Sequence, residues 1–258
     1  MEITSAQNPR IKQAVKLKNT KERKKTGLIL IEGEKEISSA ITAGIEIKVL
    51  FYAEELAKGE KIKMGGNKTI QVSKNIFQKM AYRENPDGFL AIGVTKKIEL
   101  SEIKLKENPL LVILESVEKP GNLGAILRSA DAAGADAVII ADPKTDVYNP
   151  NVIRASLGTV FTNQVATVSN KEALAWLKEK GIKSFAATPS TNKLYTKVDF
   201  KNSSAIVIGT EDKGLSEEWL RAADEKIKIP MAGKIDSLNA SVSAAIILFE
   251  AVRQRNID

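Results

Sequence analysis

Short apolar runs alternate with helix-forming segments through the second half of the chain. The runs at residues 110–114 and 205–208 are continuously apolar, which is typical of strands covered on both faces of a parallel sheet. Repeated strand–helix units imply a mostly parallel sheet with helices on both faces. We expect strands at 110–114, 137–141, 164–168, 184–188 and 205–208, and helices at 122–133, 151–157, 170–180 and around Trp219 and Leu220.

The first half predicts a smaller α/β domain. We expect one or two helices within residues 1–26, with Ser5 as a cap, and a Gly/Lys loop at 58–68. A helix capped by Ser73 is expected to run to about Arg83. Further elements are expected as strands at 28–31, 47–52, 69–72 and 89–94 and a helix at 35–43. A polar stretch then marks a boundary, which divides the chain into a domain at 1–96, a linker at 97–109 and a domain at 110–258.

The last stretch, from Lys226 to Arg255, predicts a strand, a loop and a long helix. Ile227 and Ile229 form the strand, Pro230 ends it, and the helix follows Asn239. One face of this helix carries Val242, Ala245, Ile246, Phe249 and Val252. Because Ile247 and Leu248 lie on other faces, the helix is apolar around much of its circumference. Such a helix is buried or packs on another subunit.

Composition narrows the chemistry. The 258 residues include no cysteine and no histidine, which excludes disulfides, thiolate or imidazole metal sites, cysteine nucleophiles and histidine-based triads. Chemistry must then use other polar side chains, the backbone or a bound cofactor. No apolar run reaches membrane-spanning length and no N-terminal signal is visible, so we expect a cytoplasmic protein with no membrane contact.

The net charge of +7 is concentrated in the first half. Residues 1–95 hold 17 Lys and Arg against 11 Asp and Glu, a balance of +6, whereas residues 96–258 hold 22 against 21, a balance of +1. A basic segment of this kind can follow a phosphate backbone, although a solvated lysine-rich helix face is the more common interpretation. The candidate RNA-binding residues are Arg10, Lys12, Lys16, Arg23, Lys24 and Lys25.

The first candidate loop for a ligand follows the strand at 110–114. Gly121 and Gly124 allow the backbone to approach a ligand, and the start of a helix offers free N–H groups to an anion. Asn122 and Arg128 lie six residues apart in the same stretch. The spacing is not that of a dinucleotide-binding or P-loop glycine motif. Turn chemistry for the glycines and a surface or interface salt bridge for Arg128 remain alternatives.

Two further loops lie at strand ends of the same sheet. Gly209 ends a buried strand and Glu211 follows it, with a carboxylate at a helix start as the alternative interpretation of Glu211. Ser237 and Asn239 precede the last helix. The alternative interpretation of Asn239 is that it is an N-cap of this helix and has no role in ligand binding. Ligands in α/β proteins bind at the carboxyl ends of strands, so the three loops together predict a binding site.

The three loops share their order and spacing with a known family. PGNLGAILRSADAAGADAVI, IVIGTEDKGLS and IPMAGKIDSLNASVSAAIILFEAVRQR resemble the signature motifs of the SpoU/TrmH family, RNA ribose 2′-O-methyltransferases of the knotted SPOUT class. The resemblance covers about residues 110–255. The basic first half is similar, more loosely, to the family's small RNA-binding domain and to certain ribosomal proteins. Two departures are Glu118-Lys119, where an Asp-type residue is common before Pro-Gly, and Ala240, where Val is frequent.

The resemblance implies a trefoil knot, a homodimer with the active site at the subunit junction, and S-adenosylmethionine as methyl donor without a metal. By position, Gly209, Ile229 and Leu238 would hold the donor. The reaction site would be lined by Asn122, Arg128, Glu211, Ser237 and Asn239. Arg128 keeps its proton, so we expect it to grip the phosphate beside the target ribose and lower the pKa of the hydroxyl. Glu211 would position Arg128 or the loop.

The expected substrate is 23S ribosomal RNA, because an added RNA-binding domain favours a large RNA. A transfer RNA substrate, a catalytically inactive RNA-binding relative and a role in antibiotic resistance remain open. A nucleotide-binding oxidoreductase is disfavoured by the missing glycine fingerprint.

Overall fold

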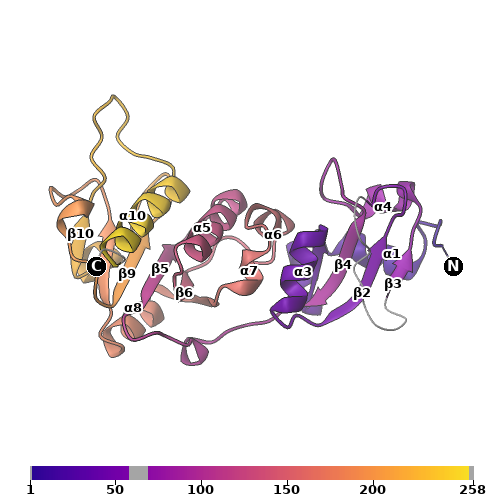
Figure 1. Ribbon diagram of the computed structural model, residues 1–258, viewed down its shortest axis with the longest axis horizontal. Helices are drawn as coiled ribbons and strands as arrows, with labels where there is room; N and C mark the ends of the chain where they lie inside the picture. The colour runs from indigo at the N-terminus through magenta and orange to yellow at the C-terminus, as the bar shows by residue number, and fades with distance from the viewer. Residues whose placement is uncertain (1, 58–68, 256–258) are drawn as a thin grey trace. The chain divides into compact units, whose positions relative to one another are not determined.

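The computed structural model describes residues 2–57 and 69–255, and its chain divides into two compact units (Figure 1). The first contains residues 1–96 and 146–162, and the second contains 97–145 and 163–258. The expected boundary after residue 96 therefore coincides with a change of unit. The segment 146–162, which we placed in the second domain, packs within the first unit. The expected limits of the RNA-binding domain and of the methyltransferase domain stay a prediction.

The first unit has a mixed sheet in the order β1-β4-β2-β3 among the described residues. β4 pairs antiparallel with β1 and β2, and β3 lies parallel to β2. Its core includes Leu30, Phe51, Phe77 and Leu90, and Ile11 from the first helix packs against the same cluster. The elements are α1 (Pro9–Lys16), α2 (Thr20–Thr26), β1 (Leu28–Glu32), α3 (Glu34–Thr42), β2 (Ile47–Tyr52), β3 (Thr69–Gln71), α4 (Lys74–Met80), β4 (Phe89–Val94), α6 (Pro150–Ala155) and α7 (Thr159–Thr162).

The second unit has a fully parallel six-stranded sheet in the order β10-β8-β9-β5-β6-β7, as the continuous apolar runs predicted. The central strands β5 and β9 are buried along their whole length. The elements are η1 (Leu100–Glu102), β5 (Leu110–Glu115), α5 (Pro120–Ala132), β6 (Ala137–Ala141), β7 (Val165–Val168), α8 (Asn170–Glu179), β8 (Lys183–Ala187), η2 (Tyr195–Lys197), β9 (Ser204–Ile208), α9 (Glu217–Ala222), β10 (Glu225–Ile227) and α10 (Ala240–Arg255).

Helices cover both faces of this sheet. Leu111 and Ile113 of β5 face a core that contains Trp176 of α8 and Trp219 of α9. The helices α5 and α10 pack against each other, and α10 also contacts β9 (Figure 1). None of the helices in the described part of the chain is long and apolar enough to cross a membrane.

Several local expectations were wrong at the ends of elements. The cap of α1 is Asn8, whose side chain accepts a hydrogen bond from Arg10 N, and not Ser5. Ser73 precedes α4 without a side-chain capping bond, and α4 ends at Met80. The last strand ends at Ile227, before Ile229, and the short helix α7 was not predicted. The Gly/Lys loop expected at 58–68 lies outside the described residues.

Arg23, which we included among the candidate RNA-binding residues, is buried in the first unit. Its side chain is 2% exposed and forms an ion pair with Asp146 at 2.6 Å. Its guanidinium also donates to the carbonyl oxygens of Leu17 and Lys18 and to the hydroxyl of Thr20. A buried charge is tolerated only when it is paired in this way, so Arg23 organises the loop between α1 and α2 and does not reach RNA.

Candidate functional site

The candidate site lies at the carboxyl edge of the parallel sheet in the second unit. The loops after β5 and β9 leave these neighbouring strands in opposite directions, because β5 leads to β6 and β9 leads to β10. Such a switch point is where open α/β sheets bind ligands. Two adjoining cavities open there, one of about 300 Å³ and one of about 110 Å³, and they share wall residues from Gly209 to Lys213.

The loop after β9 is folded so tightly that it requires glycine at its start. Thr210 and Gly214 exchange backbone hydrogen bonds of 3.0 Å, which brings the two ends of the turn together. A Cβ atom at Gly209 would collide with the backbone of Gly214 and Leu215. Gly214 has a φ of +67°, which favours glycine there as well. The loop therefore presents its backbone to both cavities.

A buried hydrogen-bond network fixes this loop from below. Glu115, at the end of β5, accepts hydrogen bonds from Ser216 N and from Asn170 Nδ2, each at 2.8 Å. Asn170 Oδ1 in turn accepts a bond of 2.8 Å from Trp219 Nε1. The network joins β5 to the first turns of α8 and α9, so the loop 209–216 is anchored at both ends.

We expect Glu115→Ala to lower the free energy of unfolding by about 2–6 kcal/mol, because it leaves Asn170 Nδ2 and Ser216 N unpaired at about 1–3 kcal/mol each. Chemical denaturation followed by tryptophan fluorescence measures this, since Trp219 belongs to the network. The matched control is Glu118→Ala, which removes an exposed carboxylate three residues later. Equal stability of the two variants would show that the network does not stabilise the fold.

Asn122 and Asn239 come together at the facing ends of α5 and α10. Asn239 Nδ2 lies 3.3 Å from Asn122 Oδ1 and donates to it. Asn239 Oδ1 accepts a bond of 2.9 Å from Ser241 N, so Asn239 also caps α10. Asn122 Nδ2 is buried and has no acceptor among the described residues. The pair thus leaves one amide donor unpaired but buried, and Asn122 is not part of the wall of either cavity.

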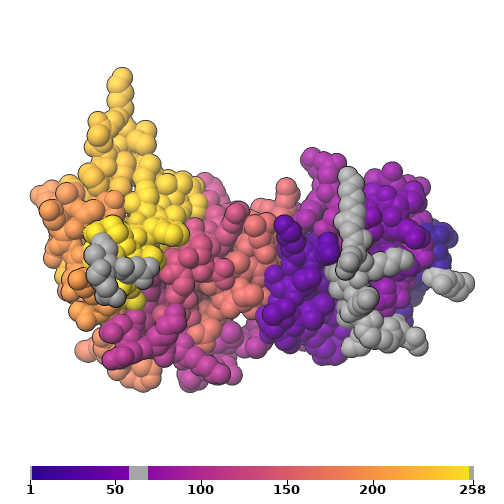
Figure 2. All heavy atoms as spheres, in the orientation of Figure 1, coloured from indigo at the N-terminus to yellow at the C-terminus, as the bar shows by residue number. Residues whose placement is uncertain are grey.

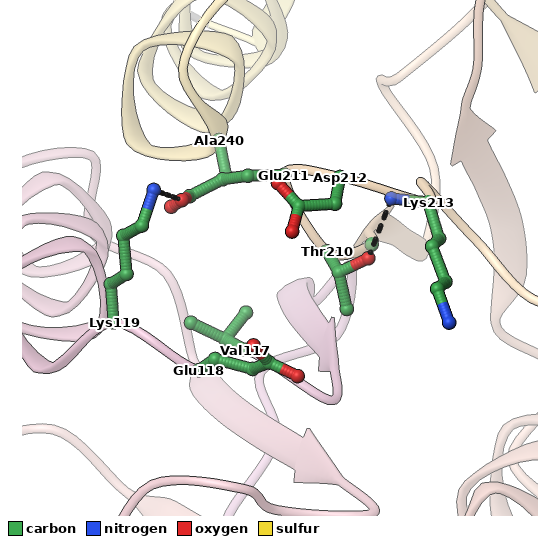
Figure 3. A pocket seen from close by; sticks show the side chains of 9 residues that line it. Val117, Glu118, Lys119, Thr210, Glu211, Asp212, Lys213 and Ala240 are labelled. Carbon is green, nitrogen blue, oxygen red and sulfur yellow. Dashed lines mark hydrogen bonds and ion pairs between the residues drawn. The ribbon is translucent and has the colours of Figure 1, made fainter.

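Glu211 forms an ion pair with Lys119 across the smaller cavity (Figure 3). The hydrogen bond and the charge of Glu211 raise the pKa of the Lys119 ammonium above its ordinary value. Glu211 lies in the turn at 210–214, well before α9 begins at Glu217, so its interpretation as a helix-start carboxylate is wrong. In this chain Glu211 pairs with Lys119 and not with Arg128.

Arg128 lies away from both cavities of its own chain. It follows Asn122 by six residues, which displaces it about 9 Å along the helix axis and about 120° around it. Its side chain is exposed and is not part of either cavity wall. It makes no hydrogen bond or ion pair with another described residue. The single chain therefore does not bring Arg128 to Asn122 and Glu211.

The larger cavity contains the residues expected to hold a cofactor. Gly209, Ile229 and Leu238 are all part of its wall, and Ser237 lies beside Leu238. Ser237 is exposed, and its hydroxyl lies 3.1 Å from Asp236 Oδ1. The loop from β10 to α10, which carries Ser237 and Leu238, extends away from the body of the second unit (Figures 1 and 2).

Sequence reasoning missed a fourth loop of this site. Thr188, Pro189 and Ser190 follow β8 and form part of the wall of the larger cavity, together with Met231. The small polar residues at the end of a strand were the signal that could have identified this loop. Lys119 was noted only as a departure from the family pattern.

In the first unit, the other candidate RNA-binding residues are accessible. Arg10, Lys12 and Lys16 of α1 form part of a surface hollow that also includes Glu22. Lys24 and Lys25 of α2 are exposed. These five side chains form no ion pair with a described residue, so their charges are available to an anionic partner.

The wall of the larger cavity combines apolar side chains with polar backbone groups. Ile208, Ile227, Ile229 and Leu238 form apolar wall, and the backbone of the glycine loop supplies polar groups. A volume of about 300 Å³ is at the lower end for small-molecule sites. The described residues contain no cluster of three or more acidic side chains that could hold a metal ion.

Comparison with known proteins identifies the family. The model of the SpoU rRNA methylase family matches residues 109–249, which is more than half of the chain. The chain belongs to this family. Residues 8–91 match the MRM3-like substrate-binding domain. The family resemblance expected from the three motifs is therefore confirmed. The expected enzyme class, an RNA 2′-O-methyltransferase, is also confirmed, because it is the class of this family and of its relatives.

Relatives of this SpoU chain act on ribosomal RNA. It is 29% identical to the 23S rRNA (guanosine(2553)-2′-O)-methyltransferase RlmP of Bacillus subtilis, over 96% of this chain and 98% of that protein. It is 33% identical to the 23S rRNA (uridine(2479)-2′-O)-methyltransferase of Streptomyces viridochromogenes, over 93% and 87%. The AdoMet-bound rRNA methyltransferase structure from Sinorhizobium meliloti is 32% identical and covers 98% and 97%, with a TM-score of 0.89.

Proposed function

We propose that this protein transfers a methyl group from S-adenosylmethionine to a ribose 2′-hydroxyl of 23S ribosomal RNA. The observation that carries the proposal is a cavity walled by Gly209, Glu211 and Leu238, whose wall residues Leu238 and Ala240 flank Asn239, the residue that bonds Asn122. Two relatives that match almost the whole chain are 23S rRNA 2′-O-methyltransferases, and a structural relative binds AdoMet. These similarities support both the donor and the class of acceptor.

Gly209, Ile229 and Leu238 would hold the donor. When bound, S-adenosylmethionine supplies an electrophilic methyl group on a sulfonium, so the proposed reaction requires no metal. The tight turn at Gly209 lets the backbone approach the donor without a side chain between them. The wall combines apolar side chains such as Ile229 and Leu238 with polar groups, so it offers contacts to both the apolar and the polar parts of the donor.

The ribose hydroxyl would be oriented by the amide pair. The unpaired donor Asn122 Nδ2 is buried here and would bond a ribose oxygen after the amide turns toward the entrance, where Asn239 contacts it. Ser237 would add a hydroxyl on the other side of the entrance. Alignment of the hydroxyl with the methyl group would supply much of the rate. Arg128 would bind the neighbouring phosphate and make the hydroxyl more acidic.

Arg128 can reach this site if it comes from a second subunit, so we propose a homodimer with the reaction site at the junction. The apolar stripe of α10 supports this. Val242 is 46% exposed and Phe249 is 48% exposed, although both are large apolar residues. An exposed apolar helix face of this kind indicates an interaction surface.

We expect Phe249→Asp to convert the dimer to monomers and to abolish methyl transfer, because it places a charge in the apolar stripe. Light scattering with size-exclusion chromatography measures the mass. The control is Ile41→Asp, which changes another apolar residue that is 40% exposed but lies on α3. A monomeric wild type, or a dimer that survives the change, would contradict the proposed surface.

The first domain would bind the RNA through Arg10, Lys12, Lys16, Lys24 and Lys25. Their exposure, together with the match to a substrate-binding domain, supports this role. We also propose a trefoil knot in the second domain. The end of α10 returns to the segment before β9, where Gln254 Nε2 donates to Val198 O and Arg255 Nε donates to Phe200 O, as a threaded C-terminal helix would require. We infer a cytoplasmic location from the rRNA substrates of the relatives.

The proposal is tested by methyl transfer from labelled S-adenosylmethionine to separate substrates. Purified wild type is incubated with ribosomal RNA and with transfer RNA from a strain lacking the gene, and 2′-O-methylated positions are mapped. We expect incorporation into 23S RNA at one position. The relatives modify a guanosine and a uridine, so the mapped base is not fixed by the fold. Labelling of transfer RNA alone, or of neither RNA despite donor binding, would overturn the proposal.

A further inference from the structure

We infer that Lys119 is a substrate-binding residue whose ammonium binds a phosphate of the RNA beside the target ribose and so positions the 2′-hydroxyl. This inference rests on the proposed function, because it names RNA as the ligand. It adds a cation that the family pattern does not supply, since an Asp-type residue is common near this position.

The backbone of Lys119 is fixed next to the reaction site. Lys119 precedes α5, and its carbonyl oxygen accepts bonds of 3.1 Å from Asn122 N and Leu123 N. The side chain therefore starts one turn away from the Asn122 amide. It forms part of the wall of the smaller cavity and stays 68% exposed, so its ammonium can meet a large ligand from solution (Figure 3).

The wall of the smaller cavity contains more negative than positive side chains, so the positive charge of Lys119 affects whether a phosphate can bind there. The wall contains the carboxylates of Glu118, Glu211 and Asp212 and the ammonium groups of Lys119 and Lys213. Three negative against two positive charges leave −1, and without Lys119 the balance would be −2. A wall of this net charge repels a phosphodiester, so a phosphate is expected to contact it only at a cation that faces solution, as Lys119 does. Lys119 neutralises Glu211 and still has N–H donors free for an anion.

Glu211 keeps this cation both placed and charged. Its carboxylate side chain is 18% exposed, and it holds the Lys119 ammonium at the cavity mouth. The hydrogen bond from Lys119 to Glu211 raises the pKa of Lys119, so the ion pair favours the charged form of this lysine. Arg128 of the same chain is not part of either cavity wall, whereas Lys119 is part of the wall of the smaller cavity. Lys119 therefore supplies a positive charge near the site without the second subunit that Arg128 would require.

Lys213 provides a matched control within the same cavity. It lies at the turn of the glycine loop, on the opposite side of the cavity from Lys119 (Figure 3). It is exposed, and its ammonium forms no ion pair with a described residue. Replacing either lysine removes one positive charge from the same wall, so a difference between the variants reports placement and not net charge.

The experiment compares Lys119→Met, Lys119→Arg and Lys213→Met with wild type. We expect Lys119→Met to lower kcat/KM for RNA by about 10- to 100-fold, the size of one charged hydrogen bond. The slope of log affinity for RNA against log salt should fall by about one phosphate contact. Affinity for S-adenosylmethionine should stay at the wild-type value. Lys119→Arg should restore the salt slope. Lys213→Met should lower kcat/KM for RNA and the salt slope less than Lys119→Met does, with donor affinity measured in both variants because Lys213 also lines the larger cavity.

Each remaining outcome overturns the inference. If Lys119→Met and Lys213→Met behave alike, the placement of the ammonium does not matter. If Lys119→Met loses S-adenosylmethionine binding, Lys119 supports the donor pocket and not the RNA. If it lowers activity without changing the salt slope, it holds no phosphate. Failure of the proposed function is separate, because then the wild type itself transfers no methyl group to RNA.

Discussion

A Gly209→Ala variant is expected to bind S-adenosylmethionine at least about 100-fold more weakly than wild type and to transfer no measurable methyl group. The new methyl group would overlap the backbone of Gly214 and Leu215, which cannot move aside as a flexible side chain can. Overpacking of this kind costs about 1–3 kcal/mol before any loss of shape in the pocket. The turn must open, and the wall of the donor cavity opens with it. Calorimetric titration of the donor measures the effect.

Gly121→Ala is the control for this experiment. A Cβ at Gly121 meets nothing within 4 Å, and the residue lies in the first turn of α5, next to Asn122. We expect this variant to bind the donor as wild type does. Wild-type donor affinity in Gly209→Ala would contradict the assignment of the cavity. A thermal melt of both variants separates loss of the pocket from loss of the fold.

Two inactive variants are expected to restore activity when they are combined. Arg128→Ala and Asn239→Ala should each lower the rate by at least about 100-fold, since by our proposal Arg128 binds the neighbouring phosphate and Asn239 helps to orient the ribose. If the site takes Arg128 from one subunit and Asn239 from its partner, a mixed dimer contains one intact site. Equal mixing gives half mixed dimers, each with half its sites intact, so about a quarter of wild-type activity should return.

The control pairs two residues that already lie together in one chain. Asn122 and Asn239 share a hydrogen bond, so a mixture of Asn122→Ala with Asn239→Ala should contain no intact site. Differently tagged subunits, co-purified before the assay, show whether mixed dimers form. Mixed dimers of Arg128→Ala and Asn239→Ala without activity would place the whole site within one chain and overturn the proposed junction.

The sequence predicted the sheet of the second unit well because its signals are local. Continuous apolar runs such as 110–114 can be buried on both faces only in a covered strand, and β5 and β9 have that form. The loop at Gly209 follows from where β9 ends, and the loop at Asn239 follows from where the last helix begins. The interpretation of Asn239 as an N-cap is confirmed, and its role in the reaction site stays a prediction that its contact with Asn122 supports.

The charged residues show where sequence reasoning stops. Arg23 and Lys24 are neighbours in one basic segment, yet Arg23 is buried against Asp146 and Lys24 is exposed. The partner lies more than a hundred positions away, so no local pattern could separate the two. The same limit hid the ion pair of Lys119 with Glu211 and the network that joins Glu115 to Trp219.

By itself, the sequence determined the order of strands and helices, the glycine loop and the absence of thiol and imidazole chemistry. These depend on residue type and short spacing. Only the tertiary structure decided which charges are buried, which carboxylate faces Lys119, and that Arg128 lies outside the cavity of its own chain. Such contacts depend on how distant segments pack, because a side chain has a partner only where the folded backbone brings one within reach.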